Sequence, residues 1–322
     1  MVDITSNSIA APTVAVARHQ YIAFAVMLAL LVAAPFFVYP IFLMDALCFA
    51  LFACAFNLLV GYAGLLSFGH AMFLGSAGYL SAHAAKVWGF PPELAILTGT
   101  ATAALLGLIT GAVAIRRQGI YFAMTTLALA QMIYFFCLEA KFTGGEDGIQ
   151  RVPRGVLFGA LDLSRDMALY WVVLAVFLFG FLLIYRTIHS PFGQVLKAIR
   201  ENEPRAVSLG YKVDQYKLIA FVLSAALAGL AGSTKAIVFQ LASLTDVNWP
   251  MSGEVVLMTL LGGLGTVFGP VAGAFIVIAL ENYLAQLGAW VTIVQGVIFI
   301  VCVLTFRRGV IGELGRLLRK SL

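Results

Sequence analysis

The residues of this chain that could do chemistry are few, and they lie inside or beside long apolar runs. The main ionisable side chains in such positions are Asp45, His70, His83, Glu254 and Glu281. Acidic residues deep in a membrane typically bind the protons or sodium ions that drive a carrier. Only Asp45 lies plainly within a run that should cross, whereas Glu254 and Glu281 lie near the outer ends of another. The pattern disfavours an ion-coupled carrier working alone, and it disfavours an intramembrane enzyme.

The sequence also lacks the motifs of common enzyme sites. It contains no GxxxxGK[ST], HExxH or GxSxG segment, so the chain has no P-loop of its own for ATP. The cysteines occur without CxxC or zinc spacing, and all lie in apolar runs, as is typical of small packing residues: Cys48, Cys54, Cys137 and Cys302. We therefore expect no catalytic residue, no metal site and no cofactor in this chain.

One charged segment, residues 190–212, interrupts an otherwise apolar sequence. Between Arg186 and Lys217 there are six Lys or Arg residues and three acids, and apolar runs of about membrane length flank them. The segment predicts a docking surface for a soluble partner on the cytoplasmic side. The alternative is a helix that lies on anionic lipid headgroups. Glu201 and Glu203 disfavour pure lipid binding.

A short amphipathic helix is expected within the charged segment. Val195, Leu196 and Ile199 would form its apolar face at helical spacing. The charged residues between them, Lys197, Arg200 and Glu201, would face water or a partner. Pro204 is expected to end this helix and Gly210 to permit a turn. A helix of this kind can insert into a groove on a soluble domain.

Composition places the chain among membrane proteins. It has 322 residues, of which 62% are hydrophobic and 11% charged, with a mean hydropathy of +0.99. A soluble domain would carry roughly a quarter charged residues. The net charge of +5 is concentrated in the charged segment and in the last residues of the chain, which matches the excess of basic residues in cytoplasmic loops. No stretch could form the basic face that nucleic-acid binding requires, so we expect membrane lipids and no nucleic acid as partners.

The apolar runs predict an all-α integral membrane protein of about ten segments. The candidate spans are 21–38, 41–60, 64–85, 93–115, 119–138, 168–188, 216–239, 251–284 and 289–306. Alternation across the membrane puts 139–167 outside and 190–215 inside. The basic tail, 307–322, and the N-terminal segment, 1–20, are also expected inside. The tail stays inside only if 251–284 crosses twice or enters and returns.

Two glycine-rich segments predict broken helices, one in each half of the chain. Gly64-Leu-Leu-Ser-Phe-Gly-His70 resembles Gly265-Thr-Val-Phe-Gly-Pro270. Paired interruptions of this kind point to a transport pathway, because irregular backbone at membrane depth must line a cavity or be buried in protein. The alternative is a pair of unrelated close helix contacts made by small residues. The candidate pathway residues are Ser67, Phe68, Gly69, His70, Gly265, Thr266, Phe268 and Gly269.

Six collinear motifs resemble the membrane permeases of branched-chain amino-acid ABC transporters. They are NLLVGYAGLLSFGHAMFLGSAGYLSA, GIYFAMTTLALAQ, TGGEDGI, SPFGQVLKAIRENEPRAVSLGY, KLIAFVLSAALAGLAGS and LLGGLGTVFGPVAGA, between about residues 40 and 285. The SFGHAxF form of the first motif is similar to that of the LivM-type subunit. The resemblance implies a type II ABC-importer-like permease in a bacterial inner membrane.

The resemblance also implies partners and a division of labour. A periplasmic binding protein would deliver substrate, this chain and a second permease would form the pathway, and two cytoplasmic ATPases would bind ATP and drive transport. The residues it suggests for ATPase coupling are Lys197, Arg200, Glu201, Glu203, Arg205 and Gly210. Branched-chain or related hydrophobic amino acids are the expected substrates, with urea, short amides or aromatic acids as the alternative. Classes outside the family are an ion-coupled carrier and a non-transporting scaffold.

Two further features allow two interpretations each. His70 could hydrogen-bond a passing carboxylate, or it could fix a tight glycine-rich turn through its ring nitrogens. The loop 139–167 could meet a charged binding-protein rim, since it contains both acids and arginines, or it could be a solvated loop.

Overall fold

The computed structural model describes residues 13–159 and 161–284, together with 293, 294, 296, 297, 300, 309 and 312. The expected span 289–306 and the basic tail 307–322 lie almost wholly outside the described residues, as do residues 1–12. The count of ten membrane segments therefore stays a prediction.

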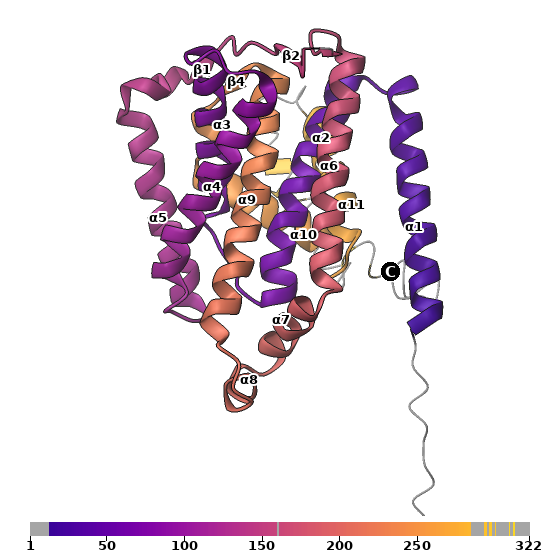
Figure 1. Cartoon of the computed structure of the whole chain (residues 1–322), viewed down its shortest axis with the longest axis vertical. Helices are drawn as coiled ribbons and strands as arrows, with labels where there is room; N and C mark the ends of the chain where they lie inside the picture. The colour runs from indigo at the N-terminus through magenta and orange to yellow at the C-terminus, as the bar shows by residue number, and fades with distance from the viewer. Residues whose placement is uncertain are drawn as a thin grey trace, which may run out of the picture.

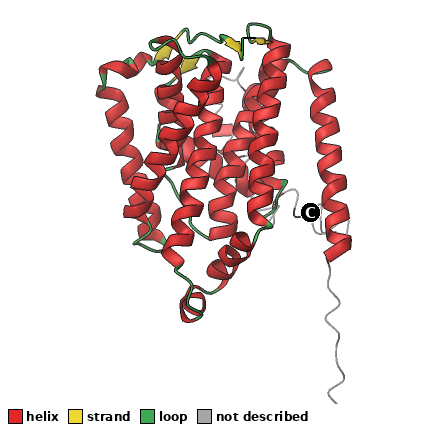
Figure 2. Cartoon of the chain, in the orientation of Figure 1, coloured by secondary structure: helices red, strands yellow, loops and turns green. Residues whose placement is uncertain are grey.

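The described chain is a helical bundle (Figure 2). Its α-helices are α1 (Thr13–Ala33), α2 (Pro40–Asn57), α3 (His70–Lys86), α4 (Pro92–Ala114), α5 (Ile120–Glu139), α6 (Asp166–Ile188), α7 (Pro191–Glu201), α8 (Glu203–Ser208), α9 (Val213–Phe239), α10 (Trp249–Gly262) and α11 (Gly269–Leu284). Within the described residues, five helical stretches are long and apolar enough to cross a membrane: 40–63, 92–114, 120–139, 166–188 and 213–239. The expected all-α membrane fold is confirmed at this level.

Short elements complete the chain between the helices. They are the 3₁₀ turns η1 (Ala34–Phe36), η3 (Lys141–Thr143), η4 (Gly145–Asp147) and η5 (Leu244–Asp246), the π-helical segment η2 (Leu58–Ala63), and the strands β1 (Ile149–Gln150), β2 (Val156–Leu157), β3 (Leu161–Asp162) and β4 (Leu241–Ala242). Strand β1 pairs with β4 and β2 pairs with β3, both antiparallel. The β1–β4 pair joins two loops that are far apart in the sequence.

The two ends of the bundle carry different elements (Figure 1). Helices α7 and α8 lie at one end, together with the turn after α4, where Gln118 donates a hydrogen bond to Glu203. Strands β1, β2 and β4 lie at the opposite end, where Lys86 donates to the Gln150 carbonyl. This arrangement agrees with the alternation expected from the sequence, because 139–167 and the charged segment lie at opposite ends.

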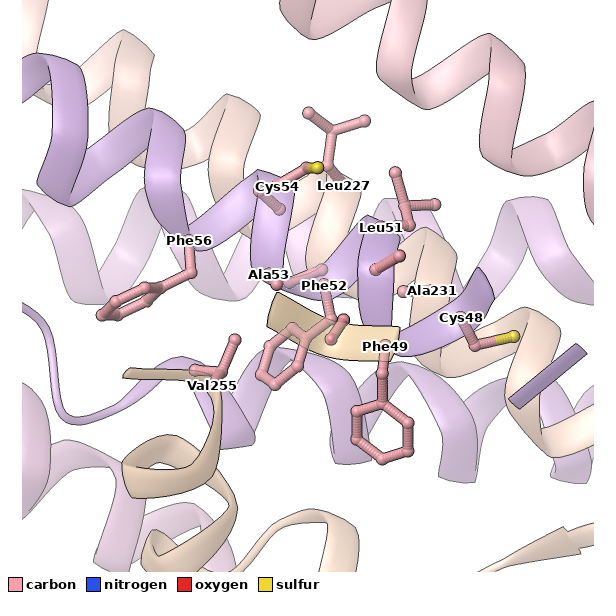
Figure 3. Close-up of a cluster of buried hydrophobic side chains, with 14 of the residues drawn as sticks. Cys48, Phe49, Leu51, Phe52, Ala53, Cys54, Phe56, Leu227, Ala231 and Val255 are labelled. Atoms are coloured by element: carbon pink, nitrogen blue, oxygen red, sulfur yellow. The ribbon is translucent and has the colours of Figure 1, made fainter. Parts of the chain in front are cut away.

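Helix α2 occupies the centre of the bundle. Nearly all of its side chains from Leu43 onward are buried, and it contacts α6, α9, α10 and α11. Figure 3 shows its aromatic residues Phe49, Phe52 and Phe56 directed away from the side on which Cys54 approaches Leu227 of α9. A helix that is apolar on every side needs neighbours or lipid all round, and here it has neighbours.

The outer helices present apolar surface to the surroundings. Leu97 and Leu105 of α4 are 61% and 58% exposed, and Tyr121 and Phe135 of α5 are 69% and 58% exposed. Such a belt is unfavourable in water and favourable in a lipid bilayer. Helix α1 stands beside the bundle (Figure 1), where Tyr170 donates a 2.6 Å hydrogen bond to the Leu31 carbonyl.

Three expectations from the sequence need correction or refinement. The expected span 64–85 is helical only from His70, because residues 64–69 are not helical and Gly64 adopts a left-handed φ of 73°. Pro204 does not end a helix: Asn202 ends α7 and caps α8, and Pro204 occupies the first turn of α8, where its missing N–H has no cost. The region 251–284 is not one helix, because α10 ends at Gly262 and α11 begins at Gly269, so the chain is broken in its glycine-rich middle as the sequence predicted.

Candidate functional site

The first glycine-rich interruption follows α2. The α-helix widens into the π-helical η2, which ends at Gly64, and residues 64–69 lead to α3. We call residues 58–69 the first break. π-Helical turns often occur at functional sites, and they leave the last carbonyls without regular partners. The sequence indicated the glycines but gave no signal for the π-helical turn.

The second interruption, residues 263–268, joins α10 to α11. Gly263 and Gly265 have φ values of 121° and 76°, which side chains with a Cβ rarely adopt. Thr266 closes the turn, since its Oγ1 donates to the Gly263 carbonyl at 2.8 Å and accepts from the Gly269 N–H at 3.1 Å. We call residues 263–268 the second break.

The two breaks contact each other through Asn57. The Asn57 side chain accepts from the Gly265 N–H at 2.9 Å and donates to the Thr266 carbonyl at 2.8 Å. A Cβ on Gly61 would lie 2.8 Å from the Gly265 nitrogen, so the approach requires glycine. The sequence paired residues 64–70 with 265–270 by resemblance. In the structure the second of these segments contacts Asn57 and Gly61, which come just before the first. Asn57 was not identified from the sequence, because nothing local distinguishes it from any other polar residue at a helix end.

Arg200 of α7 reaches both breaks. Its guanidinium Nη1 donates to the Gly61 carbonyl and lies 3.4 Å from the position that a Cβ on Gly265 would take. Its Cγ lies 3.0 Å from the corresponding position on Gly64. Arg200 was expected to face water or a partner; it is exposed, and its guanidinium also donates to the backbone of the protein itself.

A polar cleft opens where α7 meets the two breaks. Its volume is about 470 Å³, and it is lined by Gly61, Tyr62, Ile188, His189, Lys197, Arg200, Glu201, Gly265 and Val267. Lys197 lies over the Tyr62 ring, 5.5 Å from its centroid. Of the eight candidate pathway residues, only Gly265 lines this cleft.

The rest of the charged segment divides into an inward and an outward side. Leu196 and Ile199 are buried, as the amphipathic pattern predicts. Glu203 accepts from Lys217 Nζ at 2.7 Å, which ties α8 to α9. The outward residues include Glu201, Arg205 and Gly210 together with the apolar Val207, Leu209 and Tyr211, which are 56%, 69% and 41% exposed. This mixed charged and apolar surface protrudes at the α7–α8 end (Figure 1).

Residues Ser67 to Gly69 are held by neighbouring helices and do not line the cleft. The Phe68 N–H donates to Thr126 Oγ1 of α5 at 3.2 Å, and a Cβ on Gly69 would lie 2.4 Å from the Thr126 carbonyl oxygen. Ser252 Oγ of α10 accepts from the N–H of Ala71 at 2.9 Å, next to the start of α3. Phe268 lies elsewhere, against Phe181 of α6. The close-contact interpretation therefore fits Gly69 directly.

His70 is fully buried at the start of α3. Its Nε2 lies 2.8 Å from Ser224 Oγ of α9, and Ser224 donates its only hydrogen to the Ala55 carbonyl at 2.5 Å. Nε2 must therefore carry the proton and donate it to Ser224. The rings of Phe56, Phe73 and Phe221 surround the imidazole at centroid distances of 5.1–6.2 Å. These contacts favour the structural interpretation, in which His70 fixes the helix start against α2 and α9.

A second charged cluster lies toward the β-strand end of the bundle. Lys235 of α9 forms a 2.6 Å ion pair with Asp246 of η5, and its Nζ lies 4.7 Å from the Phe49 ring centroid. Asp45 of α2 interacts electrostatically with both residues and with Glu281. The sequence identified Asp45 and Glu281 but missed Lys235, whose ion pair joins the last turns of α9 to η5. Within the described residues, no group of three or more His, Cys, Asp or Glu side chains could hold a metal ion.

Comparison with known proteins gives a consistent result. Residues 38–303 match the family described as branched-chain amino acid transport system / permease component. The high-affinity branched-chain amino acid transport system permease protein LivM of Escherichia coli K12 is 26% identical over 279 residues, which cover 79% of this chain and 65% of that protein. The chain thus spans slightly less than two thirds of that relative's length.

The substrate in a relative's name is not always the same. A probable branched-chain amino acid transport permease protein LivM of Methanocaldococcus jannaschii is 28% identical over 53% of this chain and 51% of that protein. The ribose import permease protein RbsC of Bacillus subtilis is 29% identical over 69% of this chain and 70% of its own length. No solved structure matches the chain.

Proposed function

Because the chain belongs to the branched-chain amino acid transport system permease family, we propose that it is one membrane subunit of a binding-protein-dependent ABC importer. It would form half of the path for branched-chain or related hydrophobic amino acids, in the inner membrane of a bacterium. Both termini and the α7–α8 end would face the cytoplasm. The chain itself would hydrolyse no ATP.

The observation that carries this proposal is the contact between the charged segment and the two breaks. Through Arg200 and Asn57, one protruding charged surface connects with irregular backbone from both halves of the fold. An importer driven by separate ATPases needs such a connection between a docking surface and the pathway. A membrane scaffold would need only the surface, so the breaks favour transport.

We assign the outward residues of α7 and α8 to ATPase docking. Glu201, Arg205 and Gly210 are exposed, and Leu209 offers an apolar anchor at the tip. Lys197 and Glu203 would support this surface, since each contacts the protein itself. At the other end, the loops joined by β1 and β4 would receive the periplasmic binding protein. A second permease would complete the pathway.

Two groups of solutes are candidate substrates. Resemblance to LivM proteins favours branched-chain amino acids, and resemblance to RbsC shows that related permeases carry other solutes. Urea, short amides and aromatic acids stay the alternative substrates that the resemblance stated from the sequence implies. An ion-coupled carrier is the alternative of another class, and the half-buried Asp45 near Lys235 is the observation that favours it.

Co-purification tests the docking surface. Arg205→Glu combined with Leu209→Asp should abolish recovery of the ATPases with the tagged chain from detergent-solubilised membranes, and the second permease should remain. Arg116→Gln is the matched control, because Arg116 is exposed at the same end but outside α7 and α8. Unchanged recovery of ATPases with the double variant would refute the docking assignment.

A further inference from the structure

We infer that Arg200 is a positioning residue that transmits movement of α7 to both breaks, and that it acts inside this chain instead of on the ATPases. The inference rests on the proposed function, since it requires a partner that moves α7. Arg200 is itself exposed, but the role assigned to it differs from that of Glu201 and Arg205 on the same loop, because its guanidinium contacts both breaks.

The geometry sets Arg200 apart from the other charged residues of α7 and α8. Its guanidinium is a planar fork of five donors that can engage more than one backbone group. It donates to the Gly61 carbonyl of the first break, lies against Gly265 of the second, and packs its Cγ against Gly64. Lys197 also contacts the first break, over the Tyr62 ring, but among the described hydrogen bonds those of Lys197, Glu201 and Arg205 include none from a side chain to either break.

The Gly61 carbonyl is available because of where the helix ends. Beyond η2, the N–H groups of Gly64 and Leu65 both turn back to the Leu59 carbonyl. The carbonyls after Leu59 are therefore left without regular helical partners at the end of the segment. A charge-assisted donor from another helix satisfies one of them, which makes the shape of the first break depend on the position of α7.

The packing of helix α7 favours its movement as one unit together with Arg200. Ser190 caps its first turn by accepting from the Gly193 N–H at 3.3 Å, and Leu196 and Ile199 hold its inner face. The approach to α6 is close, since a Cβ on Gly193 would lie 2.3 Å from the Ile188 carbonyl oxygen. We therefore expect a displacement of the outer face of α7 to displace Arg200 by a similar amount.

Asn57 links the two breaks, so that a displacement of one affects the position of the other. Its side chain bonds the N–H of Gly265 and the carbonyl of Thr266 while its own backbone leads directly into η2. Displacement of the first break must therefore displace the second or break two hydrogen bonds. The sequence of contacts is α7, Arg200, Gly61, Asn57 and the second break.

The test uses the assembled complex in inside-out vesicles. Leu264, next to Gly265 and 39% exposed, is replaced by cysteine in a background whose four native cysteines are alanine. The labelling rate with a membrane-impermeant maleimide is measured without nucleotide and with ATP plus vanadate. In this background we expect the nucleotide to change the rate several-fold, by about threefold or more, as a shift between two conformations predicts.

Arg200→Gln should remove that response. Recovery of ATPases and basal ATP hydrolysis should stay within about twofold of the unmodified complex, whereas uptake by intact cells that carry the variant should fall about tenfold or more, the size expected when a charged hydrogen bond is lost. Arg200→Lys keeps a charge without the planar fork and should retain part of the response. Arg116→Gln, an exposed arginine at the same end, should behave as the unmodified chain.

Each outcome decides the inference. If Arg200→Gln still shows the nucleotide-dependent change and normal uptake, the inference is wrong. Loss of ATPase recovery in Arg200→Gln would assign Arg200 to docking and would also overturn it. If Arg200→Gln does not assemble, Arg200→Lys decides: a reduced response with normal ATPase recovery supports the inference, and unmodified behaviour refutes it. Absence of any nucleotide effect or ATP-driven uptake in the unmodified complex would instead refute the proposed function.

Discussion

Replacing His70 with alanine should destabilise the bundle, because the imidazole fills a closed aromatic cage and joins α3 to α9. The change removes one hydrogen bond, to Ser224 Oγ at 2.8 Å, with a net value of about 1 kcal/mol. It also empties most of a fully buried site between three phenylalanine rings. In soluble cores such truncations cost about 3–5 kcal/mol, part of which is the cavity that remains.

In a bilayer the transfer part of this cost is smaller, since lipid is as apolar as the protein interior, but the packing part remains. We therefore expect His70→Ala to lower the free energy of unfolding by about 2–4 kcal/mol. For a chain of this size, this corresponds to a fall of roughly 4–10 °C in the thermal midpoint. Transport should fall as well, because the start of α3 and the end of the first break are no longer fixed.

The assay is thermal unfolding of the purified chain, followed by size-exclusion chromatography of heated samples. His83→Ala is the matched control, since His83 lies on the same helix but is only partly buried. It should lower the midpoint by less than about 2 °C. His70→Gln retains a side-chain N–H donor without the ring and should lie between the two. A midpoint and a transport rate for His70→Ala equal to those of the unmodified chain would refute both interpretations of His70.

Three further predictions follow from contacts in the described chain. Gly232→Ala should prevent folding or lower the thermal midpoint by more than 10 °C, roughly the effect of severe overpacking, because its Cβ would lie 2.0 Å from a backbone oxygen of α3. Gly253→Ala is the control and should be tolerated, because a Cβ at this position would have no atom within 4 Å. Equal stability of the two variants would refute the close packing of α9 on α3 at Gly232. Asn57→Ala should lower the free energy of unfolding by about 2–4 kcal/mol, since it leaves two backbone groups of the second break unpaired; unchanged thermal stability would contradict this. The Ser164 N–H donates to Asp162 and lowers the pKa of its carboxyl, so the turn after β3, residues 162–164, should be stable above the ordinary pKa of an aspartate and loosen as the pH falls through the lowered pKa. A turn that orders on acidification, followed by amide exchange, would contradict the sign.

The sequence predicted the elements whose signals are local and strong. Apolar runs of membrane length located α2, α4, α5, α6 and α9 within a few residues. The amphipathic spacing of Leu196 and Ile199 identified α7 and its buried face correctly. The charge pattern placed the loop 139–167 and the charged segment at opposite ends, as observed.

Features that depend on contacts between distant segments were not predictable from one sequence. Asn57 and Arg200 acquire their importance only when α7 and the second break meet the end of α2, more than 100 residues away in the chain. The lysine at position 235 gives no local sign of its ion pair with Asp246 across the turn. The start of α3 was misplaced because residues 64–69 are as apolar as a helix, and hydropathy does not register the left-handed glycine that ends one.

The measurement that tests the central claim most directly is solute uptake by purified complexes in liposomes. The tagged chain is purified from its native membranes with its associated proteins, reconstituted, and supplied with ATP on the ATPase side and radiolabelled leucine on the other. Our account predicts uptake that requires ATP and a loaded binding protein and that no ion gradient can replace. Uptake of solute by the chain alone, driven by a proton or sodium gradient, would contradict it and establish the carrier alternative.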